Sequence, residues 1–219
     1  DITDESGDDV VNLSEVATSD ITGEVEASST INSLTISDSN GNSISINPKD
    51  ITLNADGSYE VKDVDLSSLD DGELSVSVTS TDIAGNTTTS TDTITKDTVV
   101  KETTSDLADS SDSGVSNTDN ITNDTTPTIK GTTEANATVV ITDKEGNEIG
   151  TATADKDGNY EITTTPLNDG EHTLTITSTD KAGNTTTTTQ TVTIDTATTN
   201  SIDITDESGD DVVNLSEVA

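Results

Sequence analysis

Apolar and polar residues alternate along several short segments of the chain. In residues 73–80 (ELSVSVTS), Leu74, Val76 and Val78 alternate with serine and threonine, and residues 171–178 (EHTLTITS) repeat this with Leu174 and Ile176. A period of two residues with one apolar face predicts antiparallel strands with one solvated side. Shorter alternations of the same kind occur at Leu34, Ile36, Val139 and Ile141.

Turn signals separate these segments. Glycine and asparagine cluster at residues 38–41, 56–57, 71–72, 144–147, 157–158 and 169–170, and both residue types tolerate the positive φ that hairpin turns need. About seven short strands per hundred residues, with few helix signals, predict an all-β fold of immunoglobulin-like β-sandwiches. The only helix-like piece is residues 10–16 (VVNLSEV).

The two tyrosines occupy matching positions. Tyr59 and Tyr160 each lie two residues after an Asp-Gly turn. Aromatic side chains bury a large apolar area, so we expect each tyrosine to be the one large core residue of its domain. A ligand-stacking role is the alternative.

The chain contains two levels of repetition. Residues 203–219 repeat residues 1–17 (DITDESGDDVVNLSEVA) letter for letter, while residues 80–98 resemble residues 178–196 more loosely. We therefore expect two related domains, 1–100 and 101–198, followed at 199–219 by the start of another repeat. A tandem array is typical of a spacer or of multivalent display, and its chemistry is expected at the joints between domains.

The charge of the chain limits its partners. There are 44 acidic against 8 basic residues, a net charge of −36, and hydrophobic residues make up 27%. Such a composition usually indicates disorder, but the repeated strand pattern favours folded domains with thin cores. Nucleic acid and anionic membranes are excluded as partners because they need clustered Lys and Arg. No segment is apolar enough for membrane insertion, and there is no cysteine. We expect an elongated monomer that contacts neighbouring repeats, in a secreted bacterial protein.

The acidic residues concentrate in two stretches, 101–124 and 196–217, which we interpret as the joints. Crowded carboxylates repel one another, and Ca²⁺ accepts six to eight oxygen ligands in flexible geometry, whereas Mg²⁺ requires a tighter octahedron. An acid followed by Asn four residues later recurs at Asp8 and Asn12 and at Asp119 and Asn123. The candidate calcium ligands are Asp8, Asn12, Glu15, Asp97, Asp112, Asp119, Asn123, Asp124, Asp195, Asp210, Asn214 and Glu217. The alternative is a solvated acidic linker that keeps the chain soluble.

A TDxAGN element occurs once in each half of the chain, at residues 81–86 and 179–184. Its Gly and Asn are sufficient for a turn. Asp82 and Asp180 could also reach an ion from a sandwich end, and both interpretations stay open. Residues 155–158 resemble an EF-hand loop only superficially, because the spacing fails, and we interpret them as a hairpin turn.

Several long motifs resemble one protein family. Residues 122–150 (TNDTTPTIKGTTEANATVVITDKEGNEIG) and 167–196 (LNDGEHTLTITSTDKAGNTTTTTQTVTIDT) resemble the bacterial Ig-like extender repeats of giant type I-secreted adhesins, the RTX and biofilm-associated adhesins. The resemblance covers residues 117–196, and GDDVVNLSEV in the first domain is similar to the opening of such a repeat. It implies extender modules that Ca²⁺ rigidifies at the joints. It also implies ligands at Asp8, Asn12 and Glu15, at their copies Asp210, Asn214 and Glu217, and at Asp119, Asn123 and Asp124.

The function expected from these features is structural. The chain is expected to be a stalk module of a secreted cell-surface adhesin, which projects a distal binding domain for adhesion or biofilm formation, and not an enzyme. One rival is an Ig-like module that itself binds a glycan or a host-surface protein. Another is an ice-binding threonine array, which the run at residues 185–189 suggests but its copy at residues 87–91 interrupts with Ser90.

Overall fold

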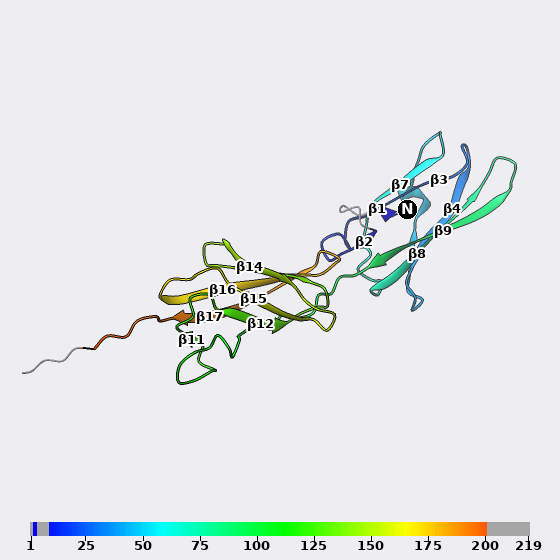
Figure 1. The fold of residues 1–219 in the computed structure, drawn as a ribbon. Coiled ribbons are helices and arrows are strands. Elements are labelled where there is room, and N and C mark those ends of the chain that lie inside the picture. Colours follow the sequence, from blue (N-terminus) through cyan, green and yellow to red (C-terminus); the bar gives the residue numbers. More distant parts are fainter. Residues whose placement is uncertain (1, 4–8, 201–219) are drawn as a thin grey trace, which may run out of the picture.

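The computed structural model describes residues 2–3 and 9–200 and contains two β-sandwiches arranged end to end (Figure 1). The predicted all-β, immunoglobulin-like fold is confirmed. The only helical element among the described residues is the short 3-10 helix η1 (Pro48–Asp50). Residues 12–16 form one helical turn, in which the Val16 N–H donates to the Asn12 carbonyl.

Domain 1 is the sandwich built from residues 2–96. One sheet has the order β1 (Ile2–Thr3), β3 (Ser19–Glu24), β7 (Ser58–Val64) and β6 (Thr52–Leu53). The other has the order β2 (Val10–Val11), β9 (Thr87–Lys96), β8 (Gly72–Thr81), β4 (Thr30–Ser37) and β5 (Ser43–Ile46).

Domain 2 is the sandwich built from residues 106–194. Its smaller sheet has the order β10 (Asp106–Leu107), β12 (Thr128–Thr132) and β15 (Asn159–Thr163). Its larger sheet has the order β11 (Ile121–Thr122), β17 (Thr185–Ile194), β16 (Gly170–Thr179), β13 (Thr138–Thr142) and β14 (Glu148–Thr153). The two domains therefore share one topology, apart from β6.

One short parallel pairing decides where the acidic segments lie. In domain 1, Val11 on β2 opposes Lys96 at the end of β9. In domain 2, Thr122 on β11 opposes Ile194 at the end of β17. The residues that follow β2 and β11 therefore lie at the end of each sandwich from which the chain leaves. Most of residues 101–124 thus belong to the body and the far end of domain 2, which differs from the expectation that this stretch forms the first joint.

The cores follow the predicted alternation. Leu34, Ile36 and Leu74 are fully buried in domain 1, and Val139, Ile141, Leu174 and Ile176 are fully buried in domain 2. Tyr59 and Tyr160 are 5% and 3% exposed, so the prediction that both are core residues is confirmed. Full burial of each of these leucine, isoleucine and valine side chains stabilises the fold by about 1.5–3 kcal/mol.

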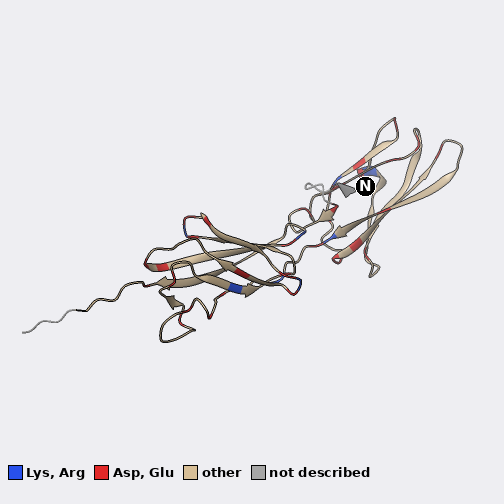
Figure 2. Ribbon diagram, in the orientation of Figure 1, with Lys and Arg blue, Asp and Glu red and all other residues tan. Residues whose placement is uncertain are grey.

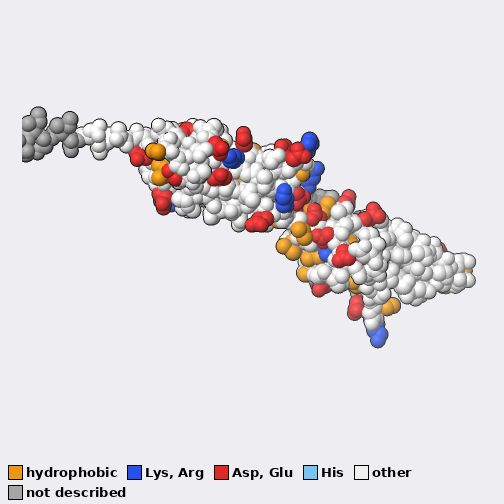
Figure 3. Space-filling model, turned by 90° about the horizontal axis from the view of Figure 1, so that it is seen from below, with side chains coloured by type: hydrophobic (Ala, Val, Ile, Leu, Met, Phe, Trp, Pro, Cys, Tyr) orange, Lys and Arg blue, Asp and Glu red, His pale blue; other side chains and the backbone are white. Residues whose placement is uncertain are grey.

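Charged residues are spread over both sandwiches, with acidic residues on many loops and strand ends and few basic residues (Figure 2). On the face that Figure 3 shows, few charged or hydrophobic side chains are visible at the outer end of domain 1. No helix in the described part of the chain is long and apolar enough to cross a membrane.

Candidate metal centre at the joint between the two sandwiches

Three carboxylates from two domains meet at the joint. Asp97 follows β9 of domain 1, Glu134 lies in the β12–β13 loop of domain 2, and Asp180 follows β16 of domain 2. One carboxylate oxygen of each lies within 4.8 Å of the others. None of the three forms an ion pair with a lysine in the part of the chain that the structure describes. No lysine of the described chain offsets their mutual repulsion, and a bound cation would do so.

The β16–β17 turn positions Asp180. Its carboxylate accepts hydrogen bonds from the backbone N–H of Asn184 at 2.8 Å and from Asn184 Nδ2 at 2.9 Å. Gly183 supplies a φ of 86° inside this turn, which other L-residues adopt only with strain. Asp180 is 7% exposed and Asn184 is 5% exposed. The TDxAGN element is therefore a turn, and the same turn carries Asp180 to the joint.

Asp97 is held by the chain that enters domain 1. Its N–H donates to the Val11 carbonyl at 2.9 Å, which extends the β2–β9 pairing by one residue. Burial raises the pKa of the Asp97 carboxyl, a hydrogen bond from the Val99 N–H opposes this rise, and the negative charges of Asp180 and Asp71 add to it. Burial is the main cause of the rise, and the two neighbouring carboxylates add to it.

Glu134 lies on the loop that faces the interdomain linker. The Lys101 N–H of that linker lies 3.4 Å from Glu134 Oε2. Within the loop, the Ala137 N–H donates to the Glu134 carbonyl, and Asn136 has a φ of 63°. This tight turn lies in the loop that crosses from the smaller to the larger sheet, whereas Asp180 follows a strand of the larger sheet.

Asn184 also bonds directly to domain 1. Its Nδ2 donates to the Asp97 carbonyl at 2.8 Å, and its Oδ1 accepts from the Leu13 N–H at 2.8 Å. A Cβ on Gly183 would lie 3.4 Å from Asn12 Nδ2, so the loop after β2 also touches this turn. The two sandwiches are in contact through one buried amide.

The donor set fits a hard divalent cation. Oxygens bound to one Ca²⁺ at 2.3–2.6 Å lie at most about 5 Å apart, and carboxylates from separate loops can adapt to its variable geometry. Mg²⁺ requires shorter bonds in a strict octahedron and keeps its waters. Neither nitrogen nor sulfur ligands are in this group, which disfavours Zn²⁺ and copper.

Two other predicted ligands lie at the same joint but outside this group. Asn12 Oδ1 accepts from the Ser14 N–H and hydroxyl at 2.8 and 2.7 Å. Glu15 is 6% exposed, and its Oε2 accepts from the Asn12 N–H at 3.1 Å. Both side chains brace the loop after β2, which places the Leu13 N–H against Asn184.

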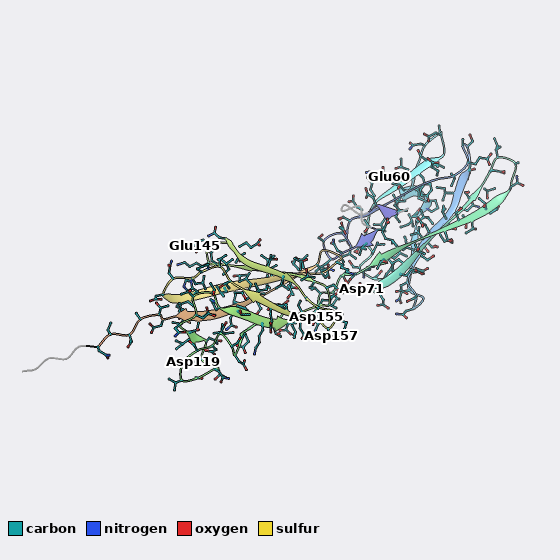
Figure 4. All side chains as sticks on the ribbon, in the orientation of Figure 1. Glu60, Asp71, Asp119, Glu145, Asp155 and Asp157 are labelled. Carbon is teal, nitrogen blue, oxygen red and sulfur yellow. The ribbon has the colours of Figure 1, made fainter. Side chains whose placement is uncertain are left out.

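Five predicted ligands, Asp112, Asp119, Asn123, Asp124 and Asp195, lie at the opposite end of domain 2. Figure 4 shows Asp119 far from the joint, whereas Asp155 and Asp157 lie near it. Asp119, Asn123 and Asp124 flank β11, which pairs with the end of β17 just before Asp195. In these positions Asn123 and Asp195 correspond to Asn12 and Asp97 of domain 1, so the recurrent acid–Asn spacing marks equivalent places in the two sandwiches.

Hydrogen bonds already occupy most oxygens of this second group. Asp124 accepts from the Ser111 hydroxyl at 3.0 Å and from the Thr126 N–H at 2.9 Å. Burial alone would raise the pKa of Asp124, but these hydrogen bonds outweigh it and lower the pKa. Asp119 accepts from the Ile121 N–H, and Asn123 from the Ser113 hydroxyl.

Asp112 is the exception. It is 7% exposed, its Oδ1 is buried without a hydrogen-bond partner in the described chain, and the buried Oδ1 of Asn120 also has none. The Asn120 N–H lies 3.4 Å from the other Asp112 oxygen, so the two residues are neighbours. Two adjacent buried acceptors without donors are costly, and they are the kind of pair that a bound cation would satisfy.

One further predicted ligand lies away from the joint. Asp82 lies in the β8–β9 turn at the outer end of domain 1, where Asn86 donates two hydrogen bonds of 2.7 Å to its carboxylate. Asp8, Asp210, Asn214 and Glu217 lie outside the described residues.

Sequence reasoning missed Glu134 and Asn184. Glu134 is a lone acid in a Thr- and Ala-rich loop, without a neighbouring acid to draw attention. A sequence pattern could have drawn attention to Asn184. An Asp followed four residues later by Asn recurs at residues 38–42, 82–86, 143–147, 155–159 and 180–184. In all five turns the Asn N–H donates to the Asp carboxylate.

Comparison with known proteins gives a match for each domain. Residues 99–196 match the bacterial Ig-like domain family, and residues 11–98 match domain B of glucodextranase. No curated protein sequence matches the chain.

Solved structures of large bacterial adhesins are similar to the chain. A tetra-tandem repeat from the extending region of a large adhesion protein is 30% identical over 85% of this chain and 49% of its own, with a TM-score of 0.38. A Ca²⁺-stabilized adhesin that helps an Antarctic bacterium bind ice is 26% identical over 90% of this chain and 49% of its own, with a TM-score of 0.44. This chain spans about half the length of both. Residues 99–196 therefore belong to the family of bacterial Ig-like domains.

Proposed function

We propose that this chain is an extender segment of a secreted bacterial surface adhesin, in which Ca²⁺ bound at the interdomain joint holds successive sandwiches in line. The observation that supports this most directly is the meeting of Asp97, from domain 1, with Glu134 and Asp180, from domain 2. An ion bound there joins two domains, so its binding energy stabilises their relative orientation as well as each fold.

The mechanism follows from charge and geometry. Without a cation, three carboxylates at one joint repel each other and favour separation of the domains, against the hydrogen bonds of Asn184. With Ca²⁺, the same carboxylates pull the ends of β9 and β16 together. The segment then transmits the position of one domain to the next, as a stalk that projects a distal binding domain requires.

The other parts of the proposal concern location and partners. The net charge of −36 suits a calcium-containing extracellular medium. The solved proteins named above include the extending region of an adhesion protein and a Ca²⁺-stabilized adhesin, and the proposal gives this chain the same kind of role. Direct glycan binding is less well supported because both tyrosines, the only aromatic residues, are core side chains.

Calorimetric calcium titration of two matched variants tests the proposal. Glu134→Gln removes a joint carboxylate, whereas Glu26→Gln changes the corresponding loop of domain 1, which has no neighbouring domain in this chain. We expect Glu134→Gln to weaken the joint site at least about tenfold and Glu26→Gln to leave it unchanged.

Small-angle X-ray scattering provides the functional readout. Calcium should narrow the distribution of interdomain orientations of the parent chain, chelator should reverse this, and magnesium should restore much less. Equal behaviour of both variants, or scattering that chelator leaves unchanged, would refute the joint-calcium mechanism.

A further inference from the structure

In domain 2, the interdomain linker forms part of the sandwich. Thr104 lies alongside the edge of β12, where its N–H donates to the Thr132 carbonyl at 2.8 Å. The Tyr160 hydroxyl donates to the Thr104 carbonyl at 2.6 Å. Gly131 makes room for this contact, because a Cβ there would overlap the Thr104 carbonyl oxygen. The linker thus extends β10 by several residues toward domain 1.

The neighbouring linker residue points into the sandwich. Thr103 is 3% exposed, and its hydroxyl lies 3.0 Å from that of Thr133, which lies 2.7 Å from the hydroxyl of Ser178. Thr133 and Ser178 are completely buried. The linker therefore covers the opening between the two sheets at this end of domain 2.

In domain 1, the corresponding place is an open groove of about 470 Å³. Glu24, Val25, Ser29, Val78 and Ser80 are among the residues that line it. A smaller hollow of about 160 Å³ shares Glu24 and Val78 with this groove and reaches Tyr59. We call the two together the β3–β8 groove.

Equivalent positions identify what the groove lacks. Gly23 and Gly131 lie against the hydroxyls of Tyr59 and Tyr160, so these pairs match. Val25 and Thr133 also occupy equivalent positions. The Val25 carbonyl lies next to Gly57, and the Thr133 carbonyl lies next to Gly158, each the glycine of an Asp-Gly turn. Thr133 is fully buried, whereas Val25 is only half-buried. The Tyr59 hydroxyl donates no hydrogen bond to any described residue, in contrast to Tyr160.

We propose that the β3–β8 groove is the docking site for the linker that precedes domain 1 in a tandem array, namely a copy of residues 200–202. The register supports this occupant. Leu107 opposes Ile129, and Ile2 opposes Ile21, so Leu107 and Ile2 are equivalent. Thr104 lies three residues before Leu107, and Ser201 lies three residues before Ile204, which is the repeat copy of Ile2.

The chemistry of this segment fits the groove. Its Ser201 carbonyl accepts the Tyr59 hydroxyl, and Asn200 takes the place of Thr103 beside Ser80, where its amide finds a hydroxyl partner. Glu24, Glu26 and Asp82 line the groove, so an acidic segment is repelled. Residues 196–202 (TATTNSI) carry no charge, in a chain with 44 acidic residues.

Docking of the linker goes beyond the calcium joint and needs no metal. It adds an edge strand to β3 and closes the sandwich, as the segment before β10 does in domain 2. Edge-strand addition uses backbone hydrogen bonds for affinity and small pockets for selectivity. Each domain 1 in the array is then fixed to the preceding domain by an embedded linker as well as by an ion.

The test is an N-terminal extension of the full chain by its own residues 196–202, studied in chelator so that calcium has no part in the result. The reference carries a Gly/Ser extension of the same length. Hydrogen exchange of the β3 edge is followed by mass spectrometry. We expect the native extension to slow exchange around Glu24 at least about tenfold relative to the reference.

Four variants make the result specific. Tyr59→Phe should remove part of the protection that the native extension provides, whereas Tyr160→Phe should leave that gain intact. Val25→Asp, on the half-exposed groove wall, should abolish the gain, and Val25→Thr, which copies domain 2, should keep it. Equal protection by the native and the Gly/Ser extensions, or a gain that survives Val25→Asp, overturns the proposal.

Discussion

The side-chain amide of Asn184 donates to the backbone carbonyl of Asp97 at 2.8 Å, across the joint between the two sandwiches. The same side chain accepts from the Leu13 N–H and binds the carboxylate of Asp180. One buried residue thus joins the end of the last strand of domain 1, the loop after β2 and the turn that carries the Asp180 carboxylate. The joint is organised by hydrogen bonds before any cation is bound.

Asn184→Ala should therefore loosen the joint even in chelator. The substitution leaves the Leu13 N–H and the Asp97 carbonyl without their partner, at a cost of about 1–3 kcal/mol. X-ray scattering should record a wider range of interdomain orientations. Asn86→Ala is the matched control, since Asn86 makes the same turn with Asp82 but has no neighbouring domain in this chain. An identical effect of both substitutions would mean that the turn, and not the cross-joint bonds, matters.

Asp112 and Asp124 should respond differently to calcium. Asp112 has a buried oxygen without a donor, so Asp112→Asn should be neutral or stabilising in chelator, because it removes an uncompensated buried charge. In calcium the same substitution should destabilise domain 2 if an ion binds beside Asn120. Asp124→Asn keeps one acceptor oxygen but removes the charge that strengthens the hydrogen bonds from Ser111 and Thr126, and it should cost about 1 kcal/mol in both conditions. Melting temperatures of the two variants, each with calcium and with chelator, test this contrast.

Local patterns were enough to predict the strands, and two of the three joint carboxylates were among the candidates. Alternation at Leu74 and Val76 reports which face is buried, and this information is contained in a few consecutive residues. The location of Asp119 is a different problem. It depends on β11 pairing in parallel with β17, a contact between distant segments that no local pattern encodes. Glu134 was missed for the same reason, because only the fold brings it to Asp97 and Asp180.

Acid should weaken domain 1 through Asp38. Hydrogen bonds from the Asp70 N–H and from the Asn42 side chain lower the pKa of Asp38 from 3.8 to about 2. A folded-state pKa below the unfolded value means that the carboxylate stabilises the fold above pH 3.8 and that this contribution is lost as the pH falls toward 2. Asp38→Asn should flatten the pH dependence of denaturant unfolding in that window and lower stability at neutral pH. An unchanged slope would contradict the assignment.

Gly131→Ala should release the linker from domain 2. An alanine Cβ would overlap the Thr104 carbonyl oxygen and crowd the Tyr160 hydroxyl, so residues 103–105 must move away from β12, at a cost of about 3 kcal/mol. Gly146→Ala serves as the control. It lies in an open turn with a φ of 85° and no atom within 4 Å of the added Cβ, so only backbone strain of about 1–2 kcal/mol is expected. Hydrogen exchange of residues 103–105 should rise for Gly131→Ala alone.

Asp195 should do at the next joint what Asp97 does at this one. Its N–H donates to the Thr122 carbonyl at 2.8 Å, just as the Asp97 N–H donates to the Val11 carbonyl at 2.9 Å. The domain that follows such a joint contributes the other carboxylates. In domain 1, Glu26 and Asp82 lie in the turns that correspond to those of Glu134 and Asp180 in domain 2. The Ser29 N–H donates to the Glu26 carbonyl, as the Ala137 N–H does to the Glu134 carbonyl. We therefore predict that each domain carries one half of a calcium site at either end. In a chain of two complete repeats, calorimetry should detect one additional joint ion for each additional junction.

Asp195→Asn should remove the ion at the junction between repeats and leave the Asp97 junction intact, and Asp82→Asn in the second repeat should have the same effect. If neither substitution changes the number of bound ions, the two kinds of joint are not equivalent and only the one at Asp97 binds calcium.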